Sequence, residues 1–195
     1  MQKSVPIGQG AMAALIGSSI EQAEQLAEKI SEQNIQLVCD VADDNAPGQV
    51  VLSGHADAIE AAINQSVDYG AKNAMRLPVS APFHCSLMRP AADIMKEALS
   101  NSNIIDPIAP IIANVTAKPE VQAEKISDLL VRQVTGRVRW TETIKYAKKN
   151  GIEKVYEASL HGSMGIQRVE TDAHGRVRQV LDREPSKSVS YTHLT

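Results

Sequence analysis

Three features of the first eighty residues of this 195-residue chain predict an α/β fold. Short apolar runs alternate with stretches of helical periodicity, turn residues separate two of the runs, and a serine with helix-capping spacing precedes the first helical stretch. The resulting order, β-α-β-β-α-β over residues 8–79, is the ferredoxin-like arrangement. Because many unrelated activities use this unit, the fold class by itself names no function.

The first strand and the first helix are predicted within residues 11–30. Residues 11–16 are apolar and end at Gly17, which favours a short strand. Ser18 is followed three residues later by Glu21, which is the spacing of a capping box. The helix that follows has an apolar face at helical spacing, made of Ile20, Ala23, Leu26, Ala27 and Ile30.

Two strands, a second helix and a fourth strand are predicted next. Residues 35–41 and 49–53 are expected as strands on either side of a turn at residues 43–48. Residues 74–79 supply the fourth strand. The second helix ends at Gly70, and its apolar face is made of Ile59, Ala62, Ile63 and Val67.

Composition argues against several classes of function. A net charge of −3 and an aromatic content of 3% do not fit a nucleic-acid partner. The longest apolar runs are too short to cross a membrane, and the first six residues lack the apolar core of a signal peptide. Cys39 and Cys85 make no metal-ligand cluster, and the spacing of His161, His174 and His193 fits no common metal site. We therefore expect a cytoplasmic protein without metal, nucleic-acid or membrane partners.

His84 is the residue with the most evident chemistry. It lies in residues 78–90, a loop in which Pro82 disfavours helix and which leads into a new helical pattern. A loop on a rigid scaffold can aim an imidazole, which titrates near neutral pH, as a general base. Judged from the residues alone, a capping or packing role is the more frequent one for such a histidine.

Four ordered segments resemble the malonyl-CoA:acyl carrier protein transacylase family over residues 1–157. The segments are residues 8–14 (GQGAMAA), 45–51 (NAPGQVV), 78–88 (PVSAPFHCSLM) and 130–134 (LVRQV), the last followed by Val138-Arg139-Trp140. The resemblance implies an α/β-hydrolase-like acyltransferase core into which a ferredoxin-like subdomain is inserted. Residues 8–79 would be the small subdomain, and residues 80–157 the C-terminal part of the core. Residues 158–195 depart from the family, and we expect a frameshifted or chimeric segment there, with a disordered tail as the alternative.

The resemblance also implies a reaction and a set of site residues. The family transfers a malonyl group from malonyl-CoA, a coenzyme A thioester, to the thiol of holo acyl carrier protein in fatty acid biosynthesis, through a serine ester and without a cofactor. His84 would be the catalytic base, and the main-chain carbonyl at Gln133 would orient it. Asn45 would lie by the substrate cleft, and Phe83 would shape the acyl pocket. The alternatives are a surface amide at Gln133, a turn residue at Asn45 and a packing side chain at Phe83.

The sequence departs from the family at two places that matter for activity. Asp43 stands where the family usually has asparagine, and no G-x-S-x-G segment, the turn that presents the nucleophilic serine, occurs in the chain. The segment 161–165 comes nearest but has histidine in place of the first glycine. We therefore expect an incomplete, C-terminal part of the fold that is inactive by itself. The alternatives are an acyltransferase domain of a polyketide synthase and a non-catalytic ferredoxin-like binding module.

Overall fold

The computed structural model describes residues 5–6, 8–79, 81–157, 167–171 and 177–180. The chain divides into two compact units, Met1–Thr143 and Ile144–Thr195, each of which is described by itself. None of the helices in these described ranges has both the length and the apolar character needed to cross a membrane. The segment 161–165 and the histidines at 174 and 193 lie outside the described residues.

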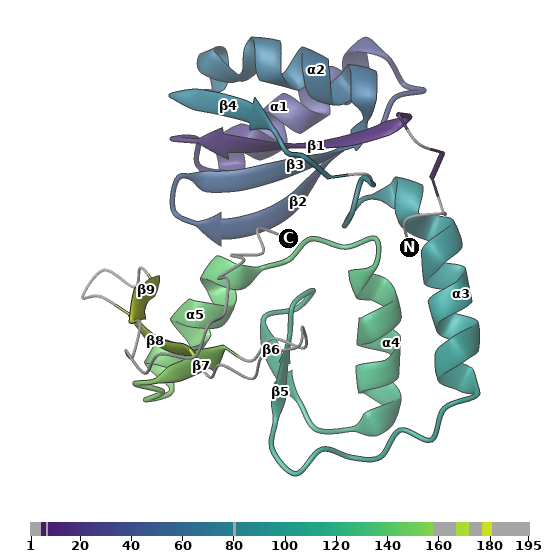
Figure 1. The fold of residues 1–195 in the computed structure, drawn as a ribbon, viewed down its shortest axis with the longest axis vertical. Helices are drawn as coiled ribbons and strands as arrows, with labels where there is room; N and C mark the ends of the chain where they lie inside the picture. The colour runs from purple at the N-terminus through teal and green to yellow at the C-terminus, as the bar shows by residue number, and fades with distance from the viewer. Residues whose placement is uncertain (1–4, 7, 80, 158–166, 172–176, 181–195) are drawn as a thin grey trace, which may run out of the picture. The chain divides into compact units, whose positions relative to one another are not determined.

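The first unit begins with a four-stranded sheet and two helices (Figure 1). Its elements are β1 (Gly10–Ile16), α1 (Ile20–Gln33), β2 (Cys39–Ala46), β3 (Gln49–His55), α2 (Ala56–Gln65), the short 3₁₀ helix η1 (Ser66–Tyr69) and β4 (Asn73–Arg76). The strands lie in the order β2-β3-β1-β4, and every neighbouring pair is antiparallel. The predicted order of elements, β-α-β-β-α-β, is therefore the observed one.

Helices α1 and α2 cover one face of this sheet (Figure 1). The predicted apolar face of α1 is confirmed, because Ala23, Leu26, Ala27 and Ile30 are buried against β1, β3 and α2. Gly70, with φ 80°, ends the second helical stretch as predicted. Val67 was wrongly assigned to the buried face, since α2 ends at Gln65 and Val67 lies exposed on η1.

The capping box of α1 lies one residue later than predicted. Helix α1 begins at Ile20, so Ser19 is the N-cap and Gln22 the third helical residue. The Ser19 hydroxyl accepts the Gln22 N–H at 3.3 Å, and the Gln22 side chain accepts the Ser19 N–H at 2.8 Å. The Ser18 hydroxyl instead donates to the carbonyl of Tyr69 at 2.9 Å, which ties the start of α1 to the end of η1.

The boundaries of two strands also differ from the predictions. Strand β2 begins at Cys39 and continues through residues 43–46, which were predicted as a turn. Bulges on both sides of Asp43 and Asp44 let these residues remain paired with β3, so the turn is confined to residues 47–48. Strand β4 covers residues 73–76 rather than 74–79, and Pro78, which has no N–H to donate, lies just beyond its end.

The second half of this unit is mainly helical. It contains η2 (Ser86–Met88), α3 (Arg89–Ser100), β5 (Ile111–Ala113), β6 (Lys118–Glu120), α4 (Ala123–Gln133) and the start of α5 (Trp140–Lys149). Helices α3 and α4 pack side by side through an apolar cluster that contains Met88, Ala91 and Val134 (Figure 1). The face of the sheet opposite α1 and α2 carries a second cluster, which contains Met12, Ala42 and Val51 and against which Phe83 packs.

The second unit contains the rest of α5 and a small antiparallel sheet. Strands β7 (Val155–Glu157), β8 (Gln167–Thr171) and β9 (Val177–Val180) lie in that order within the sheet. Strands β8 and β9 fall within the segment that was predicted to depart from the family.

Candidate active site around His84

The loop that carries His84 is held at the residues on both sides of the histidine. Phe83 packs in both apolar clusters, the one on the sheet and the one between α3 and α4. Cys85 is fully buried, and its thiol donates to the carbonyl of Pro82 at 3.1 Å. His84 itself has φ 58°, the left-handed conformation that L-residues other than glycine seldom adopt. The half-buried ring is therefore presented by a backbone that its neighbours keep in an unfavourable conformation.

A single hydrogen bond determines which nitrogen of the ring carries the proton. His84 Nδ1 lies 3.0 Å from the main-chain oxygen of Gln133. Because a carbonyl only accepts hydrogen bonds, Nδ1 must donate, which leaves Nε2 with a free lone pair in the neutral ring. A fixed neutral imidazole with an unprotonated nitrogen has the form that a general base requires.

The carbonyl that holds His84 belongs to the last turn of α4. Gln133 is the last residue of that helix, so its oxygen has no partner within the helix, and it also accepts the N–H of Gly136 at 3.3 Å. The C-terminal end of a helix carries partial negative charge, which stabilises a positive charge nearby. The contact thus orients the ring and suits the imidazolium that forms when Nε2 takes a proton.

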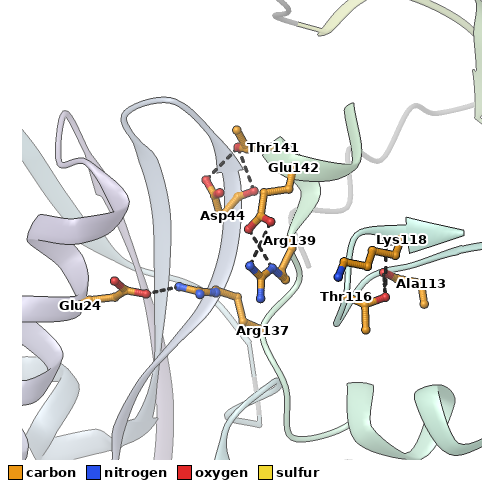
Figure 2. A network of polar contacts seen from close by, with 9 residues as sticks. All are labelled: Glu24, Asp44, Ala113, Thr116, Lys118, Arg137, Arg139, Thr141 and Glu142. Carbon is orange, nitrogen blue, oxygen red and sulfur yellow. Dashed lines mark hydrogen bonds and ion pairs between the residues drawn. The ribbon is translucent and has the colours of Figure 1, made fainter. Parts of the chain in front are cut away.

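Gln133 is kept in place by the segment that follows it, residues 134–141. The main chain of Val138 pairs with the edge of β2: its N–H donates to Ala42 at 2.8 Å, and its carbonyl accepts from Asp44 at 2.9 Å. Side chains fasten the same segment on both sides, as Figure 2 shows. Arg137 bonds Glu24 of α1 at 2.6 Å, and the Thr141 hydroxyl donates to the Asp44 carboxylate at 2.8 Å. Helix α4 is in this way tied to the sheet through the segment that leaves it.

Arg139 strengthens the start of α5. Its guanidinium makes two hydrogen bonds to the Glu142 carboxylate, at 2.8 and 3.0 Å, in the bidentate geometry of a strong ion pair (Figure 2). These bonds are the main reason why the pKa of Arg139 is raised. The charge of Arg139 is therefore paired within residues 139–142.

His84 borders an open groove of about 520 Å³ on the surface of the first unit. The groove is lined by α1, β2 and residues that follow α4, including Glu28, Asp40 and Arg137. Because His84 lines a partly polar hollow, the residue is not enclosed in apolar packing and a reacting group can approach it.

Asp43 is a buried acid in the surroundings of His84. Its side chain is 1% exposed, and neither carboxylate oxygen has a hydrogen-bond partner among the described residues. Burial raises the pKa of the Asp43 carboxyl, and the nearby His84 opposes that rise in part. Asparagine, the residue that the family resemblance predicts here, would not carry this cost of burying an ionisable group.

The two cysteines do not have the character of nucleophiles. Burial raises the pKa of Cys39 to about 12 and also raises the pKa of Cys85 above its ordinary value. Both thiols therefore stay protonated at neutral pH, whereas nucleophilic cysteines are thiolates in polar, positive surroundings. Cys85 serves instead as an apolar anchor next to His84.

The remaining predicted site residues are placed less directly. Phe83 adjoins His84 and packs against both apolar clusters. Asn45 is half-buried at the second bulge of β2 and is not among the residues that line the groove beside His84. The structure thus brings His84 and Gln133 together and adds no such contact for Asn45.

Two residues near His84 were not predicted as part of the site. The Asp40 carboxylate accepts both the main-chain N–H and the hydroxyl of Ser86, at 2.9 and 3.0 Å. Asp43 was noted only as a departure from the family. The contact between Asp40 and Ser86 joins residues 46 positions apart, so no local pattern predicts it. The only signal in the sequence for Asp40 or Asp43 is an acidic residue within a segment that otherwise has the pattern of a strand.

The relatives found by sequence and the solved structures found by fold bear the same description. The chain is 42% identical over 157 residues to the malonyl CoA-acyl carrier protein transacylase of Escherichia coli K12, a match that covers 80% of this chain and 50% of that protein. The crystal structure of an acyl-carrier-protein S-malonyltransferase from Bartonella henselae matches with a TM-score of 0.73 and 49% identity, over 78% of this chain and 48% of the other.

A third relative was solved together with a carrier protein. It is the structure of a type II PKS acyl-carrier protein in complex with its malonyl-transacylase, with a TM-score of 0.74, 38% identity, and coverage of 78% of this chain and 48% of the other. The chain thus spans about half the length of the relatives it matches.

A different family model matches the end of the chain. The model described as the penicillin-binding protein dimerisation domain matches residues 142–190, which is less than half of the chain and mostly follows the transacylase-like part. The identities of about 40% over four-fifths of the sequence, with an α/β fold in the matched structures, carry more weight for the site. Over that part, the chain is similar to the malonyl CoA-acyl carrier protein transacylases, and it spans about half of their length.

Proposed function

We propose that this chain carries the general base of a malonyl transfer from malonyl-CoA to the phosphopantetheine thiol of acyl carrier protein in fatty acid biosynthesis. The observation that carries the proposal is the contact of 3.0 Å between His84 Nδ1 and the carbonyl of Gln133, which leaves Nε2 free. The proposed reaction uses no cofactor, and its partners are acyl carrier protein and the coenzyme A thioester. A cytoplasmic location accords with these substrates.

In the proposed mechanism, His84 Nε2 moves one proton in each half-reaction. It first takes the proton of a serine hydroxyl, whose oxygen bonds to the malonyl carbonyl carbon as the bond to sulfur breaks, and the proton passes to the departing coenzyme A thiolate. The carrier-protein thiol then gives its proton to Nε2, attacks the serine ester and releases the serine oxygen, which regains the proton. The serine belongs to a G-x-S-x-G segment that the printed sequence does not contain.

The other predicted residues have supporting roles in this proposal. The Gln133 carbonyl holds the ring and faces the positive charge that forms on it. In the proposal, Phe83 shapes the acyl pocket through its position next to His84, and Asn45 is assigned to the substrate cleft on the basis of the family resemblance alone. Support for Phe83 is its place between two apolar clusters, where its bulk limits the space beside the histidine.

We also propose the division of the chain that the sequence predicts. Residues 8–79 are a ferredoxin-like subdomain, residues 80–157 are part of the α/β-hydrolase-like core, and residues 158–195 have a separate, chimeric or frameshifted origin. The antiparallel strand order β2-β3-β1-β4 supports the first assignment. The match of residues 142–190 to an unrelated family supports the last.

The test is a hybrid enzyme in which the unmatched half of the Escherichia coli transacylase completes residues 1–157 of this chain. Transfer of malonyl groups to holo acyl carrier protein is followed by mass spectrometry. We expect His84→Ala to lower the rate at least about 100-fold, the size of effect typical of a lost general base. A rate equal to that of the unchanged hybrid would remove His84 from the mechanism.

Two matched controls separate the role of the ring from general damage. Gln133→Ala should keep at least about half of the rate, because the main-chain carbonyl that bonds His84 remains and alanine favours helix. His55→Ala removes another half-buried histidine whose Nδ1 bonds the main chain, at Val38, and should also keep most of the rate. A loss of 100-fold in either control would attribute the effect to folding instead.

A further inference from the structure

The contact between Asp40 and Ser86 holds the loop of His84 just after the histidine in the sequence. Asp40 lies on β2, and one of its carboxylate oxygens, Oδ2, accepts both the N–H and the hydroxyl of Ser86. Ser86 is the first residue of η2, which continues directly into α3. A carboxylate that accepts an N–H at the start of a helix acts as an N-cap supplied by another element, and its negative charge is favoured there.

His84 lies two residues before this cap, and its backbone conformation is unfavourable without contacts from neighbouring residues. Its φ of 58° is unfavourable for a residue with a Cβ, so the loop relaxes unless contacts on both sides prevent it. On one side, the ring nitrogen is bound to the end of α4. On the other, the chain is fixed at Cys85, which is buried, and at Ser86, which is bound to β2.

Of these contacts, the one from Asp40 joins the loop directly to a sheet strand through a charged group. Charge-assisted hydrogen bonds are stronger than neutral ones, and two of them end on the same oxygen of Asp40. Cross-strand register supports the same placement, since Asp40 is paired with Ser53, two residues along β3 from Val51, whose side chain packs in the cluster that contains Phe83. Asp40 therefore projects to the sheet face that the His84 loop covers.

We propose that Asp40 is a positioning residue for His84, which acts by holding Ser86 so that the imidazole keeps its Nδ1 hydrogen bond to Gln133. Its use in malonyl transfer rests on the proposed function, but the positioning itself does not. Asp40 is not a catalytic residue in this proposal, because it touches the loop and not the reacting atoms.

The test measures the ring of His84 directly in the full chain. Histidine-ring ¹⁵N NMR, with the His84 signals assigned by loss in His84→Gln, reports which nitrogen carries the proton and how fast the Nδ1 proton exchanges with solvent. In Asp40→Ala we expect this exchange to be faster by about tenfold or more, as the loss of charge-assisted hydrogen bonds permits local opening, and the protonated signal to shift from Nδ1 toward Nε2. In Asp40→Asn the amide oxygen still accepts from Ser86, so most of the wild-type signature should return.

Control variants distinguish an effect of Asp40 on the His84 ring from a general loss of helix stability. Asp57→Ala removes an exposed acid from the first turn of α2 and should leave the His84 signals unchanged at a similar cost in helix stability. If Asp40→Ala does not fold, Ser86→Ala carries the test and should give an intermediate exchange rate, because it removes one of the two bonds. Wild-type exchange and protonation in the folded Asp40→Ala variant, or in Ser86→Ala where that variant carries the test, would overturn the proposal. This measurement needs no turnover. Failure of the transfer assay would therefore not overturn the positioning role of Asp40, and failure of the NMR test would not overturn the proposed function.

Discussion

His84 has an unfavourable backbone angle, and one nitrogen of its ring is hydrogen-bonded to the main chain. The two features are linked, because the backbone angle directs the ring toward its hydrogen-bond partner. A left-handed residue with a Cβ costs roughly 1–2 kcal/mol, which the folded chain tolerates because Phe83, Cys85 and Ser86 are anchored around it. The conformation aims the ring at the end of α4, where the Gln133 carbonyl selects the Nδ1–H form. A main-chain carbonyl thus orients the ring where a catalytic triad would use a carboxylate.

Asp43 is the residue at which stability should depend on pH in an unusual direction. Burial raises its pKa in the folded state above the value of about 3.9 in the unfolded chain. Between these two pKa values, the folded chain keeps a proton that the unfolded chain has released, so the free energy of unfolding falls as the pH rises. The slope for one such group is at most about 1.4 kcal/mol per pH unit.

We expect Asp43→Asn to abolish this contribution. We measure the free energy of unfolding of both proteins by urea denaturation from pH 4 upward. The difference, variant minus wild type, should increase as the pH rises, because only the wild type loses the contribution of Asp43. The other carboxyl groups titrate alike in both proteins and cancel in this difference. Asp57→Asn, at an exposed position, provides the comparison and should follow the wild type at every pH. A difference between Asp43→Asn and wild type that is constant with pH would show that Asp43 titrates as an ordinary acid.

At the scale of elements, the periodicity of apolar residues predicted what packs, but not where each element begins. Helix α1 was predictable because its buried residues repeat every three or four positions, whereas its cap was placed one residue early because two serines adjoin. The continuation of β2 through Asp43 and Asp44 could not be predicted from local composition. Its pairing uses two bulges and the main chain of Val138, which is more than ninety residues away.

The same distinction applies to the site. Gln133 and His84 are 49 positions apart, and only the resemblance to a family joined them before the structure did. The contact between Asp40 and Ser86 depends on the register of β2. The sequence predicts this strand at residues 35–41, several residues before its observed start at Cys39, so the contact was not predictable. Long-range polar contacts follow from the tertiary arrangement and leave no periodic trace in the sequence.

The corrected cap of α1 gives a prediction at this scale. Ser19→Ala removes the hydroxyl that accepts the Gln22 N–H and should lower the free energy of unfolding by about 1 kcal/mol, as measured by urea denaturation. Ser19→Asp should recover most of that loss, because aspartate also caps and its charge is favoured at a helix start. If Ser19→Ala were as stable as the wild type, the capping box would contribute nothing measurable here.

At the scale of the molecule, every contact argued for His84 lies within Met1–Thr143. The transacylase relatives align over about 157 residues, and the model of another family begins to match at residue 142. Helix α5, which spans Trp140–Lys149, crosses the boundary between the two compact units. These boundaries do not coincide, so the place where the chain can be shortened is a matter for experiment.

We expect a chain that ends after Glu157 to keep the folded site. Its main thermal transition should lie within about 2 °C of the full chain, which at this size corresponds to less than about 1 kcal/mol, and the ¹⁵N signals of the His84 ring should be unchanged. The physical reason is that the hydrogen bonds of His84, Gln133 and Ser86 all have both partners before residue 144. A chain that ends after Thr143 is the comparison: it cuts α5 after its first turn, so this helix cannot form, and its transition should fall clearly below that of the longer chain. If ending the chain after Glu157 lowered the transition as much as ending it after Thr143, residues 158–195 would be part of the same folded structure, and their separate origin would have to be abandoned.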